Sequence, residues 1–184
     1  MAMLNKKEAE EVLASADLIW SAEDVAITVE RLASDITARL SETHPLVLAV
    51  MGGAVVFAGN LLPRLNFPLE FDYLHVTRYG AATSGGELNW IVEPRLSVAG
   101  RTVLVLDDIL DEGITLAAIK ERMLAQGAAA CYTAVLAEKD LGRGKPIQAD
   151  FVGLMLPNRY VFGYGMDVSG AWRNLPSIHA VKGK

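Results

Sequence analysis

Cysteine is almost absent from this chain. The one that occurs, Cys131, cannot form a disulfide within the chain, and a single thiol fits a reducing compartment. Cys131 lies in an apolar stretch, which favours a buried structural thiol over a nucleophile. The fold therefore has to be held together by a packed core.

Long apolar runs and an excess of basic charge are also missing. No run approaches the length of a membrane span, and the first residues, MAMLNKKEAEE, lack the apolar core of a signal peptide. The formal net charge of −5 argues against bulk binding to nucleic acid or to anionic membranes, although it is compatible with a local basic patch. We expect a soluble cytoplasmic protein that needs neither nucleic acid nor a membrane as a partner.

What the chain does have is enough apolar content for a core. Hydrophobic residues make up 52% of its 184 residues, which suits a single domain over residues 1–184. Strand-like and helix-like segments alternate, which predicts an α/β fold with a mainly parallel twisted sheet and helices on both faces. We expect the N-terminal and C-terminal segments to form a small hood over the carboxyl edge of that sheet. The expected helices cover residues 5–14, 22–40, 54–62 and 116–126, and the expected strands cover 46–50, 69–79, 88–92, 103–107, 130–136, 151–154 and 160–162.

The most informative segment is residues 103–115, VLVLDDILDEGIT. Its apolar beginning predicts a buried strand that ends at Asp107 and Asp108, and an amphipathic helix follows. Ligands of open α/β sheets bind at the carboxyl ends of strands, and a helix N-terminus attracts anions. Acids that can hold hydroxyl groups or a metal, beside amides that can hold phosphate, predict a sugar-phosphate ligand.

Two adjacent acids in an extended chain point to opposite faces. Asp107 and Asp108 can therefore serve one ligand only if the strand ends there. Their carboxylates could accept hydrogen bonds from ribose hydroxyls, or hold Mg²⁺ together with substrate oxygens. Gly113 would let the following backbone approach a phosphate, and Thr115 would add a hydroxyl donor. From spacing alone, a receiver-like or flavodoxin-like domain with acids at a strand end is the alternative.

This segment resembles the phosphoribosyl-pyrophosphate motif of the type I phosphoribosyltransferases. Over residues 45–181 the chain resembles their hypoxanthine-guanine branch, with several motifs in the family's order. The family commonly has Ser or Thr where Glu112 stands, and a carboxylate would repel phosphate, so we expect Glu112 to point outward. The resemblance implies a phosphoribosyl site made of Asp107, Asp108, Asp111, Glu112, Gly113, Ile114 and Thr115.

The glycine turn after the strand 46–50 has two interpretations. It is a plain tight turn, or its backbone N–H groups face an anion. The resemblance implies a pyrophosphate-binding loop of Met51, Gly52 and Gly53, with Arg173 as a further contact. Several relatives carry Lys in place of Met51, and the family often has a cis peptide here, expected between Val50 and Met51. Without the resemblance, Arg173 would be an ordinary surface arginine.

Two more regions gain a role from the resemblance. Arg78, Tyr79 and Gly80 begin a glycine-rich stretch that matches the family's flexible loop, which would close over the reacting centre; the alternative is a solvated hairpin tip. The purine site would consist of Lys139 at the purine O6, Tyr160 stacking on the base, Val161, and Asp167 accepting from its N–H groups. Taken alone, Lys139 would be solvated, and residues 160–167 would be a short core strand and turn.

The resemblance implies a purine salvage enzyme. It would transfer the 5-phosphoribosyl group from phosphoribosyl pyrophosphate to hypoxanthine or guanine, giving IMP or GMP and pyrophosphate. Asp111 would be the catalytic residue at the purine N7, by proton transfer or by electrostatics, and Mg²⁺ would be held by Asp107, Asp108 and Asp167. Such enzymes commonly form homodimers or homotetramers. The rival interpretation is a nucleotide-sensing regulatory protein on the same fold. The sequence decides neither the preference among hypoxanthine, guanine and xanthine nor the oligomeric state.

Overall fold

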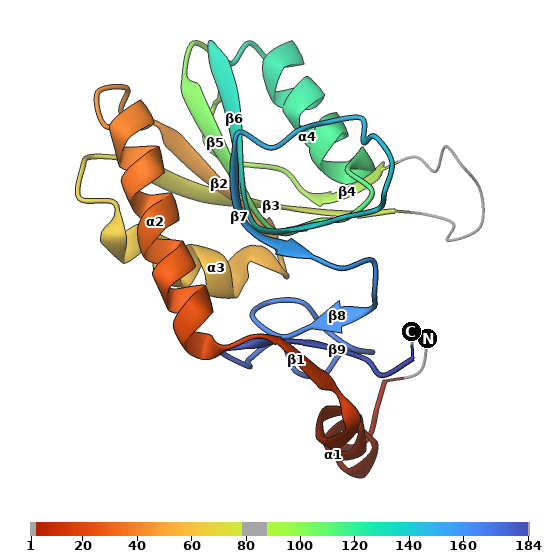
Figure 1. Ribbon diagram of the computed structural model, residues 1–184. Helices are drawn as coiled ribbons and strands as arrows, with labels where there is room; N and C mark the ends of the chain where they lie inside the picture. Colours follow the sequence, from red (N-terminus) through yellow and green to blue (C-terminus); the bar gives the residue numbers. More distant parts are fainter. Residues whose placement is uncertain (1–2, 79–87, 184) are drawn as a thin grey trace.

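The computed structural model describes residues 3–78 and 88–183, which fold into a large sheet flanked by helices and a smaller sheet beside it (Figure 1). Tyr79, Gly80 and the loop expected up to Glu87 lie outside the described residues. The elements in chain order are α1 (Lys6–Ser15), β1 (Asp17–Trp20), α2 (Ala22–Leu40), β2 (Leu46–Met51), α3 (Ala54–Leu61), the 3₁₀ helix η1 (Leu62–Arg64), β3 (Glu70–Arg78), β4 (Leu88–Val92), β5 (Thr102–Leu110), α4 (Ile114–Ala125), β6 (Ala130–Lys139), β7 (Phe151–Leu156), β8 (Val161–Phe162) and β9 (Ile178–Ala180).

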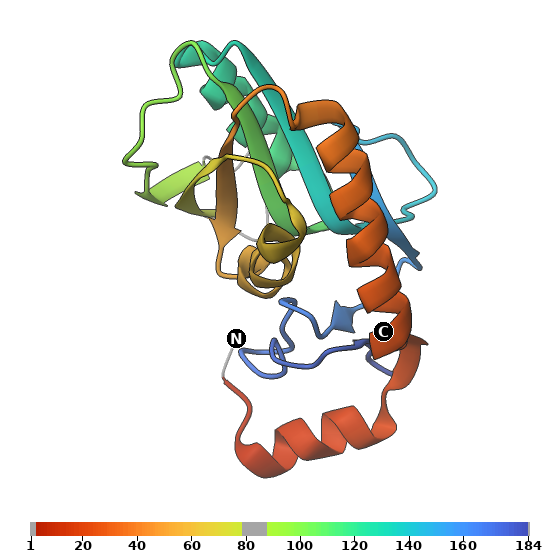
Figure 2. The same cartoon turned by 90° about the vertical axis from the view of Figure 1, so that its left-hand side faces the viewer.

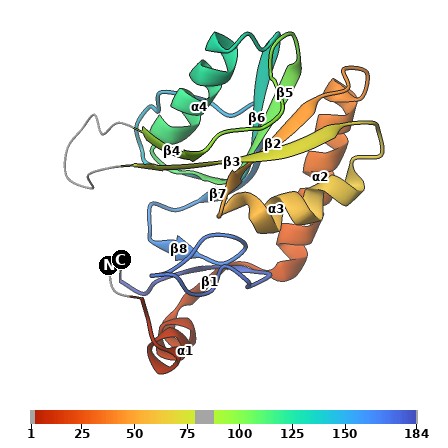
Figure 3. The same cartoon turned by 180° about the vertical axis from the view of Figure 1, so that it is seen from behind.

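The large sheet has the strand order β4-β3-β2-β5-β6-β7. All neighbours in it pair in parallel except β4, which runs antiparallel to β3. Helices α2 and α3 cover one face and α4 covers the other, as Figures 1 and 3 show from opposite sides. The predicted α/β class with a mainly parallel sheet is therefore confirmed.

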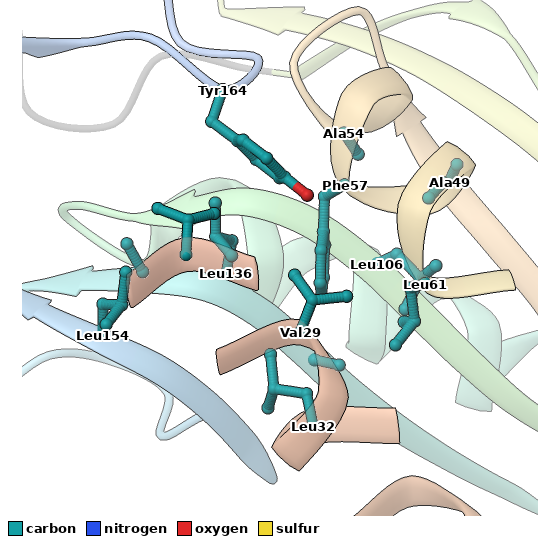
Figure 4. Packing of buried hydrophobic residues seen from close by; sticks show 14 of the residues in the cluster. Val29, Leu32, Ala49, Ala54, Phe57, Leu61, Leu106, Leu136, Leu154 and Tyr164 are labelled. Carbon is teal, nitrogen blue, oxygen red and sulfur yellow. The ribbon is translucent and has the colours of Figure 1, made fainter. Parts of the chain in front are cut away.

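The strands of the sheet centre are buried on both faces, which explains their nearly continuous apolar sequences. In β5, Leu104 and Leu106 face α2 and α3, whereas Val103 and Val105 face α4. Figure 4 shows the first side, where Phe57 of α3 packs among residues of α2 and the sheet. Burial of one such side chain contributes roughly 1.5–3 kcal/mol. The core thus fixes the strand ends from both sides.

The two N-terminal helices begin close to the predicted positions, and each has a capping residue at its start. Asn5 accepts from the backbone of Glu8 at the start of α1. Ser21 and Asp24 form a reciprocal capping box at the start of α2, which satisfies two otherwise free N–H groups. Each cap sets the direction in which a helix leaves the preceding chain.

Strand β5 does not end at the acid pair, so that prediction is wrong. Both acids lie inside the strand, where Asp107 pairs with Val135, and the pairing continues to Leu110 opposite Glu138. Ile109 and Leu110 prolong the apolar character after the acids, and β6 extends beside them as far as Lys139. The acids therefore interrupt the apolar pattern without breaking the backbone ladder.

The terminal segments form a second, antiparallel sheet of order β1-β9-β8. We call this sheet, Tyr160 just before it, its connecting residues 163–177 and α1 the hood. Figure 2 shows α1 running beneath the small sheet, and Trp172 Nε1 donates to the carbonyl of Ala9, 163 residues earlier, at 2.7 Å. Tyr164 of the hood points toward Phe57 of α3 (Figure 4), so the hood shares the core of the large sheet.

The expected burial of Cys131 is confirmed, and the lengths of the described helices can be compared with a membrane span. Cys131 is buried in β6, and its burial raises the pKa of the thiol to about 11, which makes it a poor nucleophile. Within residues 3–78 and 88–183, no helix is both long and apolar enough to cross a membrane.

Candidate active site

Two adjoining cavities lie at the carboxyl ends of β5 and β6. The first, of about 240 Å³, lies between these strand ends and the hood, and the second, of about 190 Å³, surrounds the start of α4. Asp108, Ile109 and Asp111 line both. The first is also lined by Lys139, Tyr160, Val161, Met166, Asp167 and Arg173, and the second by Asp107, Leu110, Glu112, Gly113, Thr115 and Leu116. The structure thus brings together predicted residues from three distant parts of the chain.

The first cavity contains a donor and an acceptor in direct contact. Lys139 Nζ lies 2.8 Å from Asp111 Oδ2, and the lysine side chain is only 12% exposed. Lys139 is the last residue of β6, whereas Asp111 follows the last residue of β5. Because the two strands are neighbours in the sheet, their ends deliver these side chains to one place. A charge-assisted pair of this kind can read one edge of a planar ligand.

The second cavity lies at the N-terminus of α4. Gly113 caps the helix with φ of 82°, a left-handed conformation that favours glycine. The N–H groups of the first helical turn have no partner inside a helix, so this end is suited to an anion. Glu112 pairs instead with Arg143, whose Nη2 lies 3.0 Å from its carboxylate. Thr115 lines the cavity, whereas Ile114 is exposed.

The acid pair of β5 is electrostatically costly in the free protein. Loss of hydration raises the pKa of Asp107 well above its ordinary value, and the neighbouring charge of Asp108 raises it further. Burial also raises the pKa of Asp108, although hydrogen bonds from Asp107 and Ile109 and the charge of Arg173 oppose that rise. Such a pair is prepared for hydroxyl donors or for a cation that would relieve the repulsion.

The glycine turn after β2 is pressed against this acid pair. A Cβ atom on Gly53 would lie 2.0 Å from Asp108 Oδ2, so only glycine fits there. From the other side, a Cβ atom on Gly165 would lie 2.1 Å from the carbonyl oxygen of Gly53. The peptide bond between Met51 and Gly52 is cis, so the expected position, between Val50 and Met51, is wrong by one residue. This turn, β5 and the hood therefore meet at Gly53.

The hood residues predicted for the site are linked to one another. Arg173 Nη2 lies 2.5 Å from Asp167 Oδ1, and Arg173 Nη1 donates to the carbonyl of Gly165 at 2.6 Å. The other oxygen of Asp167 accepts from the backbone N–H of Gly170 at 2.6 Å. Tyr160, 40% exposed, donates through its hydroxyl to the carbonyl of Asp167 at 3.3 Å. The hood thus presents an aromatic ring, a carboxylate and a guanidinium to the cavity.

The three proposed metal ligands are not gathered into one cluster. Among residues 3–78 and 88–183, no three His, Cys, Asp or Glu side chains converge as a metal site. Asp107 lines only the second of these cavities and Asp167 only the first, whereas Asp108 lines both, so Asp107 and Asp108 share the second cavity although β5 continues past them. The carboxylates of Asp107 and Asp108 still suit Mg²⁺, which prefers one or two protein carboxylates together with substrate oxygens.

Some site residues were missed in the sequence, and others lie partly outside the structure. Ile109 and Met166 line the first cavity, although apolar residues carried no signal beyond the core pattern. Gly165 had a weak signal, as one of two glycines flanking Tyr164. Arg78 is the last residue of β3, opposite Leu88, whereas the rest of the expected flexible loop is outside the described residues.

Comparisons with known proteins agree on one family. The family model described as phosphoribosyl transferase domain matches residues 15–169. The hypoxanthine-guanine phosphoribosyltransferase of Bacillus subtilis (strain 168) is 36% identical over 166 residues, which cover 90% of this chain and 92% of the relative. The hypoxanthine-guanine-xanthine phosphoribosyltransferase of Tritrichomonas foetus is 31% identical, covering 90% of this chain and 91% of its own.

A solved structure supports the same conclusion. The crystal structure of a hypoxanthine phosphoribosyltransferase from Staphylococcus aureus superimposes with a TM-score of 0.87 at 27% identity, covering 92% of this chain and 94% of that one. Since the family model spans most of the chain and the curated relatives align over nearly all of it, the chain belongs to the phosphoribosyl transferase domain family.

Proposed function

We propose that this protein is a purine salvage enzyme, a hypoxanthine-guanine phosphoribosyltransferase. It transfers the 5-phosphoribosyl group of phosphoribosyl pyrophosphate to hypoxanthine or guanine, giving IMP or GMP and pyrophosphate. The observation that carries this proposal is the contact of 2.8 Å between Lys139 Nζ and Asp111 Oδ2 in the first cavity. A 6-oxopurine presents O6, an acceptor, next to N7–H, a donor, and this pair of side chains complements that edge.

The hood supplies the rest of the base site. The half-exposed ring of Tyr160 is available for stacking on the purine. The backbone of Val161 and the carboxylate of Asp167 would read the opposite edge, where a 6-oxopurine has N–H donors. Since one wall of the base site is in each sheet, we regard residues 1–184 as a single functional domain.

The second cavity would hold the sugar phosphate. Asp107 and Asp108 would accept from the ribose hydroxyls, while the backbone N–H groups from Asp111 to Thr115, including that of Ile114, surround the 5′-phosphate. The side chain of Glu112 takes no part, because Arg143 holds it. The two acids of β5 would thus bind the ribose, and the amides at the start of α4 would bind its phosphate.

The leaving group would lie on the other side of Asp108. Met51, Gly52 and Gly53 offer backbone groups there, and Arg173 offers a guanidinium, while Arg78, Tyr79 and Gly80 would belong to the segment that covers the reaction. Mg²⁺, bound at Asp107 and Asp108 with substrate oxygens, would neutralise the pyrophosphate charge as it departs. Asp167 would join it only after releasing Arg173, with which it pairs in the free protein.

The reaction is then a substitution at C1 of the ribose. The bond from C1 to the pyrophosphate oxygen stretches, positive charge develops on the sugar, and purine N9 forms the new bond. Asp111 takes the proton from N7, and its carboxylate also stabilises the developing cation. Arg173 and the amides of the glycine turn stabilise the departing oxygens. The hood excludes water, which would otherwise capture the activated sugar.

Two statements about the protein's setting belong to the same proposal. We infer a cytoplasmic enzyme without nucleic-acid or membrane partners, in keeping with the net charge of −5. We also infer a homodimer or homotetramer. Apolar side chains that are exposed on β3 and on the neighbouring edge strand β4 support self-association, with Phe71 at 41%, Tyr73 at 37% and Ile91 at 52% exposure.

A spectrophotometric assay tests the proposed reaction. The purified protein is given phosphoribosyl pyrophosphate, Mg²⁺ and one of hypoxanthine, guanine, xanthine or adenine. We expect nucleotide formation with hypoxanthine or guanine and none with adenine, whose 6-amino group offers Lys139 no acceptor. If no base is converted while IMP or GMP still binds, the chain is a nucleotide-sensing regulator and the proposed activity is wrong.

A further inference from the structure

Lys145 is a lysine whose side chain is only 7% exposed. It lies in residues 140–150, which join β6 to β7. Its ammonium group donates to the carbonyl of Leu110 at 3.0 Å, to the carbonyl of Lys139 at 2.6 Å and to Glu138 Oε1 at 3.0 Å. A buried ammonium is tolerated only when its donors are satisfied, and here three oxygens occupy all three.

The two carbonyl groups belong to the strand ends that carry the base-reading pair. Leu110 is the last residue of β5 and immediately precedes Asp111, while the second carbonyl is that of Lys139 itself. One cation therefore holds together the backbone at both members of the Asp111–Lys139 pair. Sheet hydrogen bonds alone leave such strand ends free to separate, because the ladder stops there.

The same segment also supports the start of α4. Arg143 pairs with Glu112 at 3.0 Å. Pro146 and Ile147 lie against Gly113, where an added Cβ atom would be 3.4 Å from Pro146 Cδ and 3.3 Å from Ile147 Cγ2. These side chains are not among the residues that line the two described cavities, so they contact the site from behind.

We propose that Lys145 is a positioning residue that sets the spacing between Asp111 and Lys139, the base-reading pair, where the 5′-phosphate loop begins. This rests on the proposed function, because it assigns a base to one cavity and a phosphate to the other. Lys145 lines neither of the two described cavities and acts through the backbone of Leu110 and Lys139. Misplacement of reacting groups by about 1 Å can lower the rate about a hundredfold. A cation that holds the ends of β5 and β6 together can therefore affect the rate without contacting the reacting atoms.

The test is Lys145→Met, measured in both reaction directions. We expect the KM for hypoxanthine and the Kd for IMP to rise about tenfold, because both ligands depend on the spacing. The KM for pyrophosphate in the reverse reaction should stay within about twofold, because the glycine turn from Met51 to Gly53 has no described contact with this segment. A loss of folded protein alone would lower the apparent kcat and leave all three constants unchanged.

Two further variants make the result decisive. Lys120→Met removes a lysine that holds the far end of the same segment through Asp150, at 3.1 Å, and all three constants should remain normal. Since Lys145→Met leaves the Glu138 carboxylate without its partner, the double variant Lys145→Met/Glu138→Gln is measured in parallel and should show the same selective shift. Equal shifts for IMP and pyrophosphate, or none, would overturn the positioning role. Wild-type protein without turnover would overturn the proposed function itself.

Discussion

In the free protein, Asp111 and Lys139 neutralise each other across a contact of 2.8 Å. A base that binds here has to replace this contact with hydrogen bonds from its own polar edge. An apolar ring offers neither a donor nor an acceptor, so the pair would stay closed and the ring would gain no hydrogen bond from it. A ligand with only acceptors would satisfy the lysine and leave the carboxylate unpaired. The pair therefore selects for a donor and an acceptor side by side, and each member can be tested separately.

Asp111→Asn should lower kcat by about a hundredfold or more, because an amide cannot accept the N7 proton. The KM for phosphoribosyl pyrophosphate should change little, since the phosphate loop binds through its backbone. Steady-state kinetics with hypoxanthine would measure both. Asp140→Asn, an exposed carboxylate next to Lys139 in the chain, is the matched control and should retain normal turnover. An Asp111→Asn enzyme with unchanged kcat would rule out the catalytic assignment.

Lys139→Ala should lower kcat/KM for hypoxanthine by about tenfold to a hundredfold, because a hydrogen bond to a charged group contributes roughly 1.5–3 kcal/mol. The dissociation constant of phosphoribosyl pyrophosphate should be nearly unchanged. Lys120→Ala, which removes the α4 lysine that pairs with Asp150, should leave both values as they are. If kcat/KM for hypoxanthine survives Lys139→Ala, the base lies elsewhere.

Among the elements, the helix starts and the central strands could be predicted from local sequence. The helix predicted over residues 22–40 is α2, which Ser21 and Asp24 cap, and the apolar residues of β2 predicted a buried strand. The length of β5 could not, because acids suggested a strand end and only pairing with β6 shows otherwise. Strands β1 and β9 were missed because each is short and is defined by a partner from the other end of the chain.

The candidate site also contains residues that the sequence could predict and residues that it could not. The sequence and the resemblance located Asp111, Lys139 and Arg173, whose chemistry is carried by their own side chains. The support given by Lys145 was not visible, because a lysine in a polar, glycine-containing loop has the pattern of a solvated residue. Its role depends on two backbone carbonyls, and carbonyl positions leave no trace in the choice of amino acid.

One connecting segment is fixed by a single carboxylate of β3. Asp72, 2% exposed, accepts from the backbone N–H groups of Tyr73, Arg95 and Leu96, the last two in the chain that joins β4 to β5. Burial opposes its ionisation, but these hydrogen bonds outweigh burial, so the pKa of Asp72 lies below its ordinary value. Its ionised form therefore stabilises the fold.

Asp72→Asn should lower the free energy of unfolding at pH 7 by about 1–3 kcal/mol, because one amide oxygen replaces two carboxylate oxygens. Since the folded-state pKa is lowered, the contribution is complete above the unfolded value of about 3.9 and is lost as the pH falls through the folded value. Urea denaturation from pH 6 to pH 3 should show the variants converging below about pH 4. Asp35→Asn, in an exposed pair with Arg31, should change little; a constant gap for Asp72→Asn down to pH 3 would contradict the argument.

At the scale of the whole molecule, the base site has one wall on the large sheet and the other on the hood. A nucleotide that contacts Lys139 and Tyr160 joins the two sheets, and it binds the folded state only. GMP at about a hundred times its Kd should therefore stabilise the fold by about 2.7 kcal/mol. For a chain of this size that corresponds to a rise in Tm of roughly 5–11 °C.

Thermal unfolding with and without GMP would measure this rise. AMP, which lacks the 6-oxo group, is the matched control and should produce a smaller shift. Equal shifts with GMP and AMP would mean that the ligand is held by its phosphate and ribose alone, without discrimination at the base site.

The pairing of β1 with β9 has a consequence for how the molecule is made. During translation, Asp17 is synthesised early and its partner Ala180 late. The carbonyl of Ala9 is likewise synthesised long before its donor, Trp172. The strands of the large sheet, which all lie between Leu46 and Leu156, are synthesised before β9. The residues of the phosphate end of the site are thus made before the hood residues that complete the base site.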